Sequence, residues 1–253
     1  MNRKFKALMI DCDGTLIPNA FPGIPSGKVK KAITKASKYL HVGVATSRPL
    51  VELHHIIDTL SLSGPSIIDG GAQIIDFPSK KVLVQHPLKI RDYSKICDIL
   101  IKYRTGRFVV NDNGIDIPFS KKLTPKNPLN IFILANPTDR EKIENELSKI
   151  PTIVVHEILL WRTEELKGWI GLEITDASAT KQHAILEVAK ILGIDTHEII
   201  GIGDGYTDFP LLMACGLKVA MGNAVENIKA IADYIAPPVE EDGVADVIER
   251  YVL

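Results

Sequence analysis

The chain has 253 residues, of which 45% are hydrophobic and 24% are charged. This apolar content is enough for one large core or two smaller ones, and it argues against a disordered or fibrous protein. Thirty basic and 31 acidic residues give a formal net charge of -1, so the composition offers no electrostatic footprint for nucleic acid or an anionic membrane. We therefore expect a small-molecule partner and a protein that is a monomer or a homodimer.

The cysteines and the apolar runs indicate the cellular compartment. The three cysteines never occur at the C-x-x-C spacing of a zinc knuckle or a thioredoxin-like site, so we expect reduced thiols at Cys12, Cys97 and Cys215. The first apolar run stops at Asp11 and is too short for the core of a signal peptide. No apolar stretch approaches the roughly 18 residues of a membrane span. The sequence predicts a cytoplasmic protein that does not enter a membrane.

The N-terminal part of the chain alternates between short apolar runs and amphipathic segments. An apolar run followed by turn residues, such as KALMI at 6–10, is typical of a buried strand in a parallel sheet. The apolar residues of the next segment recur at helical spacing, and Ser26 lies where an N-cap belongs. The predicted order is strand, helix, strand, helix and strand, at residues 6–10, 25–40, 41–49, 50–62 and 65–76.

Between residues 84 and 172 the pattern changes to a unit of one helix followed by two strands, and this unit occurs twice in succession. The predicted elements lie at 91–104, 107–111, 130–136, 138–149, 152–157 and 169–174. This order favours a small antiparallel sheet with two helices on one face. One continuous large sheet is the alternative, but it needs parallel crossovers that the adjacent strand pairs do not supply.

The strand and helix alternation resumes after residue 176. A helix is predicted at 179–193, where Gly193 marks its end. Strands and helices then alternate to the end of the chain, at residues 198–204, 209–216, 217–223, 224–232, 233–236 and 243–253. This pattern is typical of a doubly wound parallel α/β sheet. We predict a core domain made of residues 1–83 and 173–253, with an α+β domain inserted at 84–172.

Polar and charged side chains follow the predicted core strands. In open α/β sheets the ligand crevice lies beyond the carboxyl ends of the strands. The residues placed there, or at the start of the helix after the insert, are Asp11, Asp13, Thr15, Thr46, Ser47, Lys181, Asp204 and Asp208. Because these ends meet at one edge of the sheet, we expect the side chains to form one site.

Four carboxylates in one site indicate a bound cation. Like charges a few ångström apart repel by several kcal/mol at an effective dielectric near 20, and a hard divalent ion relieves that repulsion. The candidate ligands are Asp11, Asp13, Asp204 and Asp208, which offer only oxygen atoms. Oxygen ligands without His or Cys favour Mg²⁺, which binds through a few carboxylates and a substrate phosphate.

In these motifs the chain resembles the haloacid dehalogenase superfamily of aspartate-nucleophile phosphatases, in particular its Cof-like branch with a type IIB cap. The matching motifs are Asp11-Cys12-Asp13-Gly14-Thr15, Thr46, Lys181 and Gly203-Asp204-Gly205-Tyr206-Thr207-Asp208. The resemblance covers nearly the whole chain. It implies a Rossmann-like core sheet and an inserted cap of two helix-strand-strand units.

The resemblance also implies a role for each matched residue. Asp11 attacks phosphorus to form an aspartyl-phosphate, and Asp13 protonates the leaving oxygen and then takes a proton from the hydrolytic water. Mg²⁺ is held by the Asp11 carboxylate, the backbone carbonyl of Asp13 and Asp204, with Asp208 as a further ligand or as a partner of the ligands. Lys181 is also catalytic, because it neutralises charge on the nucleophile and on the transferred phosphoryl group. The residues expected to bind the substrate phosphate are Cys12, through its backbone amide, Thr46, Ser47, Lys181 and Asn223.

The chain departs from the family pattern at three positions. Thr207 stands where Cof-like proteins usually carry Asn, Ser47 stands where Gly is common, and Cys12 replaces an aliphatic residue. The first two remain small and polar, so they bear on fine positioning rather than on activity. A lone D-x-D-G-T is also a common turn at the end of a strand. The interpretation therefore depends on the motifs occurring together and in order.

We expect a Mg²⁺-dependent phosphatase acting on a small phosphorylated metabolite, such as a sugar phosphate, phosphoglycolate or a phosphorylated cofactor. One alternative is a phosphomutase on the same fold, which returns the phosphoryl group to the substrate. Another is a non-catalytic binding or regulatory member, against which the presence of both Asp11 and Asp13 speaks. A dehalogenase is disfavoured because displacement at carbon does not need the second acid.

Overall fold

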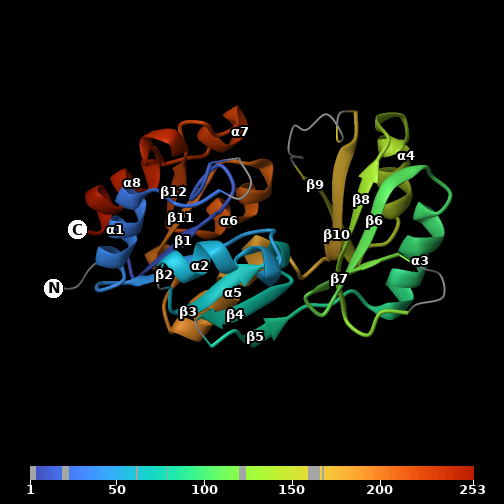
Figure 1. Cartoon of the computed structure of the whole chain (residues 1–253), viewed down its shortest axis with the longest axis horizontal. Coiled ribbons are helices and arrows are strands. Elements are labelled where there is room, and N and C mark those ends of the chain that lie inside the picture. The colour runs from blue at the N-terminus through green and yellow to red at the C-terminus, as the bar shows by residue number, and fades with distance from the viewer. Residues whose placement is uncertain are drawn as a thin grey trace. The chain divides into compact units, whose positions relative to one another are not determined.

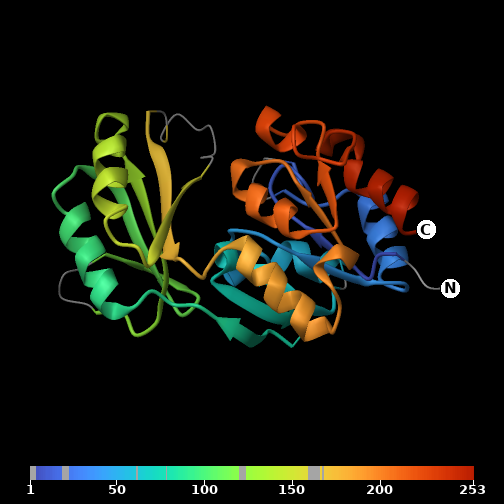
Figure 2. The same cartoon turned by 180° about the vertical axis from the view of Figure 1, so that it is seen from behind.

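The computed structural model describes residues 4–18, 23–60, 62–77, 79–119, 124–158, 166 and 168–253. The chain forms two compact units: Met1–Val84 with Lys181–Leu253, and Gln85–Thr180 (Figure 1). Figure 2 shows the same units from behind. The domain boundaries derived from the sequence stay a prediction, and each unit is described by itself.

The first unit is built on a five-stranded parallel sheet with the order β13-β12-β11-β1-β2. Its strands are β1 (Ala7–Ile10), β2 (His41–Val44), β11 (Ile199–Gly203), β12 (Leu217–Ala220) and β13 (Tyr234–Ile235). β1 is central and pairs with β11 on one side and β2 on the other. Because the strands are parallel, the segments that follow β1, β2 and β11 leave the sheet at the same edge.

Helices cover both faces of this sheet (Figure 1). They are α1 (Gly27–Ala36), α2 (His54–Leu60), α5 (Lys181–Leu192), α6 (Phe209–Ala214), α7 (Glu226–Lys229) and α8 (Gly243–Tyr251). Leu8 and Ile10 of β1 lie in the hydrophobic core with α1, α2 and α8, whereas Ala7 and Met9 lie in the core with α5 and α6. The strand is apolar throughout because both of its faces are buried. The predicted doubly wound α/β core is confirmed.

A smaller three-stranded sheet in this region differs from the predicted single strand and turn at 65–76. It contains β3 (Gly64–Ile68), β4 (Gln73–Phe77) and β5 (Lys81–Gln85). β3 and β4 are antiparallel, and the turn between them places Gly70 and Gly71 at φ 66° and 110°. Glycine adopts such angles without steric cost, so the chain reverses there. An isolated parallel bridge pairs Ala45 with Ile67.

The second unit is a five-stranded antiparallel sheet, in the order β7-β6-β8-β10-β9, with two helices on one face. Its elements are α3 (Ile90–Leu100), β6 (Thr105–Asp112), β7 (Ile115–Pro118), β8 (Pro128–Ala135), α4 (Pro137–Leu147), β9 (Ile153–Ile158) and β10 (Ile170–Asp176). Both helices pack their apolar faces on the sheet, through residues such as Ile96 and Ile143 against Ile133 and Leu172. This confirms the predicted α+β cap.

The sequence prediction missed β7. This short strand follows a two-residue turn in which Asn113 and Gly114 have φ 56° and 88°, and Asn-Gly is a strong hairpin signal. β7 has only four residues, Ile-Asp-Ile-Pro, which is too short for hydrophobic periodicity to identify it as a strand.

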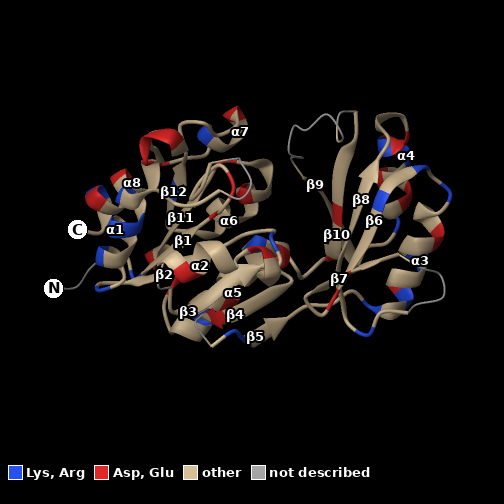
Figure 3. Ribbon diagram, in the orientation of Figure 1, with Lys and Arg blue, Asp and Glu red and all other residues tan. Residues whose placement is uncertain are grey.

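Charged residues of both signs are interspersed on each unit (Figure 3), in agreement with the near-zero net charge. Within the described residues, no helix combines the length and the apolar character that crossing a bilayer requires.

Candidate active site

Asp11 and Asp13 directly follow the central strand β1. The backbone N–H of Asp11 donates to the carbonyl of Ile202 in β11, at 3.0 Å, so the residue is still held by the sheet. The chain then turns at Gly14, where φ is 77°, and the Gly14 N–H donates to the carbonyl of Ile17. Asp11 is buried, whereas the Asp13 side chain is 32% exposed. The two carboxylates thus share one loop but differ in their access to solvent.

Lys181, the first residue of α5, connects two of the predicted carboxylates. Its Nζ donates to Asp11 Oδ1 at 2.7 Å and to Asp208 Oδ1 at 2.6 Å. All three side chains are buried, and Lys181 is only 3% exposed. An ammonium group in this position is held between two opposite charges, which offsets the cost of its desolvation.

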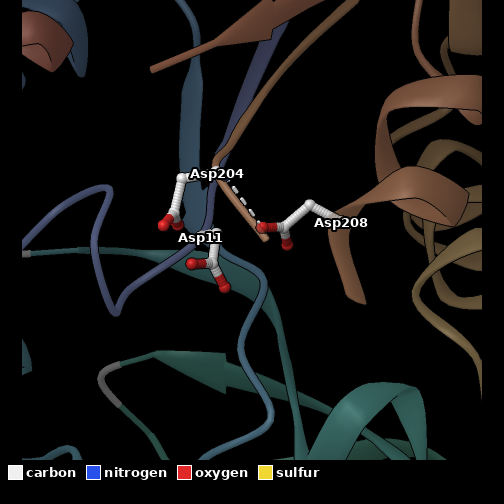
Figure 4. A group of neighbouring side chains, drawn as sticks. All are labelled: Asp11, Asp204 and Asp208. Atoms are coloured by element: carbon white, nitrogen blue, oxygen red, sulfur yellow. Dashed lines mark hydrogen bonds between the residues drawn. The ribbon is translucent and has the colours of Figure 1, made fainter. Parts of the chain in front are cut away.

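Asp204 and Asp208 belong to the short turn after β11. Asp208 Oδ2 accepts hydrogen bonds from the N–H groups of Asp204 and Gly205, both at 3.0 Å. The first of these is drawn in Figure 4, where the carboxylates of Asp11, Asp204 and Asp208 gather at the strand ends. With Lys181 on its other oxygen, the Asp208 carboxylate is fixed from both sides.

Two further residues, Thr15 and Asn223, contact the carboxylate of Asp204. Thr15 Oγ1 donates to Asp204 Oδ1 at 2.9 Å. Asn223 Nδ2 donates to the carbonyl of Gly14 at 2.8 Å and lies 3.5 Å from Asp204 Oδ2, while Asn223 Oδ1 accepts from the Val239 N–H. Asn223 therefore connects the loop after β1 with the turn after β11.

The cluster carries more negative charge than Lys181 neutralises. Burial raises the pKa of Asp11 well above its usual range, and the charge of Asp208 adds to the effect. The same causes raise the pKa of Asp204 to about 7. Burial lowers the pKa of Lys181, but Asp11 and Asp208 outweigh it and hold that pKa above its ordinary value. Lys181 therefore keeps its charge, while Asp11 and Asp204 resist ionisation.

This arrangement fits a divalent cation. Asp11, Asp204 and Asp208 each place one carboxylate oxygen within 4.8 Å of the others. Two unit charges at that separation repel by about 3 kcal/mol at an effective dielectric of 20. The donors are all oxygen atoms, which suits a hard ion such as Mg²⁺. The donor set and the surplus charge both match the metal expected from the sequence.

The carboxylate of Asp13, the fourth predicted acid, forms an ion pair with Arg48. Arg48 Nε donates to Asp13 Oδ2 at 2.8 Å, and Nη2 donates to Oδ1 at 2.5 Å. The sequence analysis did not single out Arg48. The sequence did contain a signal for Arg48. This residue comes two residues after Thr46, just past the end of β2, and so lies at the same edge of the sheet as the acids.

The other predicted residues lie around this pair. Thr46 is 1% exposed, and its Oγ1 accepts the Arg48 N–H at 3.1 Å. Ser47 is partly exposed; within the described residues, no side-chain hydrogen bond joins it to the cluster. The Cys12 side chain is fully buried, and burial raises the pKa of its thiol. Cys12 can therefore reach a ligand only through its backbone.

The chain is similar to known proteins over nearly its whole length. The family model described as haloacid dehalogenase-like hydrolase matches residues 8–123 and 112–248. The chain is 31% identical to the 5-amino-6-(5-phospho-D-ribitylamino)uracil phosphatase YcsE of Bacillus subtilis (strain 168), over 98% of this chain and 96% of the relative.

Solved structures share the fold. A haloacid dehalogenase-like hydrolase from Bacteroides thetaiotaomicron has a TM-score of 0.81 at 22% identity, covering 98% of this chain and 99% of that one. The subclass IIB sugar phosphatase BT4131 has a TM-score of 0.76 at 22% identity, covering 97% and 98% of the two chains. The chain therefore belongs to the haloacid dehalogenase-like hydrolases, and its identification as a Cof-like member is confirmed.

Proposed function

We propose that the protein is a Mg²⁺-dependent phosphatase that hydrolyses a small phosphorylated metabolite through an aspartyl-phosphate on Asp11. The observation that carries this proposal is the contact of Lys181 with Asp11 and Asp208 beside Asp204, all of them buried. A carboxylate next to a fixed cation is suited to attack phosphorus, because the approach of a negatively charged phosphate is otherwise repulsive.

The reaction has two steps. In the first, an Asp11 carboxylate oxygen bonds to phosphorus, the bond from phosphorus to the leaving oxygen breaks, and Asp13 gives that oxygen a proton. In the second, water bonds to phosphorus, Asp13 takes a proton from it, and the bond to Asp11 breaks to release inorganic phosphate. Dividing a slow hydrolysis in this way is the advantage of a covalent intermediate, and a positioned acid contributes about 10² to 10⁴-fold.

We assign the metal ligands as the Asp11 carboxylate, the Asp13 backbone carbonyl and the Asp204 carboxylate. Asp208 already holds Lys181 and two backbone amides, so we assign it the task of positioning Lys181 and the turn after β11. When bound, Mg²⁺ supplies positive charge to the nucleophile and to the transferred phosphoryl group.

The remaining predicted residues form the phosphate cradle in this proposal. Lys181 neutralises one phosphate oxygen, and the others are bound by Thr46 and by the backbone amides after Asp11, beginning with Cys12. Ser47 lies next to Thr46 and completes that side. Asn223 holds the loop after β1 through the Gly14 carbonyl, which keeps these amides in place.

The names of the relatives suggest substrates to test. One relative that spans nearly the whole chain is named a 5-amino-6-(5-phospho-D-ribitylamino)uracil phosphatase. A phosphoglycolate phosphatase of Methanopyrus kandleri is 43% identical over 35% of this chain. A panel should therefore contain a phosphorylated ribityl compound, phosphoglycolate and several sugar phosphates.

The test is release of inorganic phosphate from this panel by the purified protein, with Mg²⁺ and with EDTA. We expect Mg²⁺-dependent turnover of at least one compound and its loss in Asp11→Asn, because an amide does not attack phosphorus. Asp58→Asn, at an exposed position of α2, is the matched control and should retain turnover. Full activity of Asp11→Asn would falsify the nucleophile assignment. Isomerised sugar phosphate without phosphate release would indicate a mutase instead.

A further inference from the structure

The ion pair between Arg48 and Asp13 has an unusual distribution of exposure. The Arg48 side chain is only 6% exposed, whereas that of Asp13 is 32% exposed. Two guanidinium nitrogens contact the two carboxylate oxygens, Nε with Oδ2 and Nη2 with Oδ1. The buried arginine thus forms a bidentate ion pair with a carboxylate that is partly exposed to solvent. This geometry fixes the plane of the carboxylate as well as its position.

Arg48 is itself held firmly by its backbone. Its N–H donates to Thr46 Oγ1 at 3.1 Å, and its carbonyl accepts the Asp69 N–H at 3.1 Å. The next N–H of that turn, from Gly70, donates to the Thr46 carbonyl at 3.1 Å. The loop after β2 is therefore joined to the turn between β3 and β4, which gives the guanidinium a rigid base.

We propose that Arg48 is a positioning residue for Asp13: its guanidinium fixes the Asp13 carboxylate in the orientation from which a proton passes to the leaving oxygen. This inference rests on the proposed phosphatase function. It assigns Arg48 no contact with the substrate. Each carboxylate oxygen keeps a second lone pair when it accepts one hydrogen bond, so Asp13 can exchange a proton without leaving the arginine.

The role predicts a dependence on the leaving group. An alkyl phosphate, such as a sugar phosphate, expels a basic alkoxide that needs a proton as the bond breaks. 4-Nitrophenyl phosphate expels a stable phenolate that needs almost none. The value of kcat/KM covers the steps up to departure of the leaving group. A defect in positioning the acid therefore lowers kcat/KM for the alkyl phosphate much more than for the aryl phosphate.

The experiment measures kcat/KM for a sugar phosphate that the wild type hydrolyses and for 4-nitrophenyl phosphate, in the wild type, Arg48→Gln and Arg48→Lys. We expect the alkyl-to-aryl ratio to fall about 10-fold in Arg48→Gln, a part of the 10² to 10⁴-fold that a positioned acid contributes. Arg48→Lys keeps the charge but not the fork, so the ratio should fall by a smaller factor. Asp13→Asn should lower it most.

Two features keep the test decisive. The ratio of two substrates on one preparation does not depend on the fraction of folded protein, so a loss of stability alone leaves it unchanged. Arg140→Gln removes a partly exposed arginine that pairs with Glu144 and Glu157 in the other unit, and it should keep the wild-type ratio. If Arg48→Gln fails to fold, the ratio for Arg48→Lys decides.

An unchanged ratio in the Arg48 variants that fold, together with a lowered ratio in Asp13→Asn, overturns the positioning role and leaves the phosphatase assignment intact. Failure of the wild type to hydrolyse any phosphoester contradicts the proposed function itself, and the inference falls with it.

Discussion

Asp204 shows how strongly the position of one side chain can alter its chemistry. It is 6% exposed at the end of β11, with Asp208 close by, and its pKa is raised to about 7 by burial first and by that neighbouring charge second. The folded, metal-free protein therefore holds a proton that the unfolded chain loses near pH 4. A cation at this site takes over the role of the proton, since metal binding to carboxylates releases protons.

This linkage gives a signed pH dependence. Because the folded-state pKa of Asp204 is raised, its contribution to stability is fully present below the unfolded value near 4 and is lost as the pH rises through about 7. In EDTA, the free energy of unfolding should therefore fall with pH across this window, by at most about 1.4 kcal/mol per pH unit for one proton. Urea titrations from pH 4.5 to 8 measure it.

Two comparisons isolate the residue. Asp204→Asn removes the titrating group, so its stability should depend less on pH than that of the wild type. Mg²⁺ should stabilise the wild type more at pH 8 than at pH 5, because protons no longer compete for the carboxylates. Equal pH slopes in the wild type and in Asp204→Asn would show that the group does not titrate in this window.

The types of residue in the site were predictable, but their contacts were not. Acids after two buried strands of a parallel sheet have to meet at one edge, which placed Asp11 and Asp204 together from the pattern alone. The pairing of Asp13 with Arg48 depends on side-chain rotamers and on how deeply the loop after β2 is buried, and hydrophobic periodicity carries no information about either. Hydrophobic periodicity does not place Lys181 between Asp11 and Asp208 either; the family resemblance alone assigned Lys181 to the nucleophile Asp11.

At the scale of elements, the turn after β11 depends on a close approach that only glycine allows. A Cβ built on Gly203 would overlap the side chain of Asp208. Gly205, two residues later, has room for a Cβ, whose nearest neighbours would lie 3.8 Å away on Asp208 and Thr207. Its φ of -104° is ordinary for any residue. Only glycine therefore fits at position 203, whereas position 205 has room for alanine.

Gly203→Ala should displace the Asp208 carboxylate from the backbone amides of Asp204 and Gly205. The hydrogen bond between Asp208 and Lys181 should then be lost as well. We expect a loss of about 2 kcal/mol in the free energy of unfolding, in the range for overpacking a buried site, with a fall in phosphate release. Gly205→Ala is the matched control for stability and should change it by less than about 1 kcal/mol. Equal stability of the two variants would contradict the steric account.

The elements themselves were predictable where their burial is simple. β1 is buried on both faces and reads as a continuous apolar run, and α3 and α4 each bury one apolar face against a single sheet. β7 and the division of residues 65–76 into β3 and β4 were missed, because turn residues define them more than hydrophobic spacing does. Asn113-Gly114 and Gly70-Gly71, all at positive φ, are the residues whose turn chemistry predicts these reversals.

At the scale of the whole molecule, the site joins parts of the chain that lie far apart in sequence. Lys181 and Asp11 are separated by 170 positions, and Thr15 and Asp204 by 189. Residues 85–180 form a compact unit of their own between these parts. The parallel sheet of the first unit brings the parts together, because β1 and β11 are adjacent although most of the chain separates them. The proposed chemistry therefore depends on the whole core fold.

The central claim is that Asp11 accepts phosphorus, and trapping the intermediate tests it directly. The protein is mixed with Mg²⁺ and a hydrolysed substrate and is quenched within one turnover. Borohydride then reduces any acyl phosphate to an alcohol, and mass spectrometry of the peptides locates the modified residue. With 4-nitrophenyl phosphate, whose leaving group needs almost no proton, Asp13→Asn slows mainly the second step and should increase the yield. The account predicts homoserine at position 11. Phosphate release without homoserine there, or homoserine at another aspartate, would contradict it.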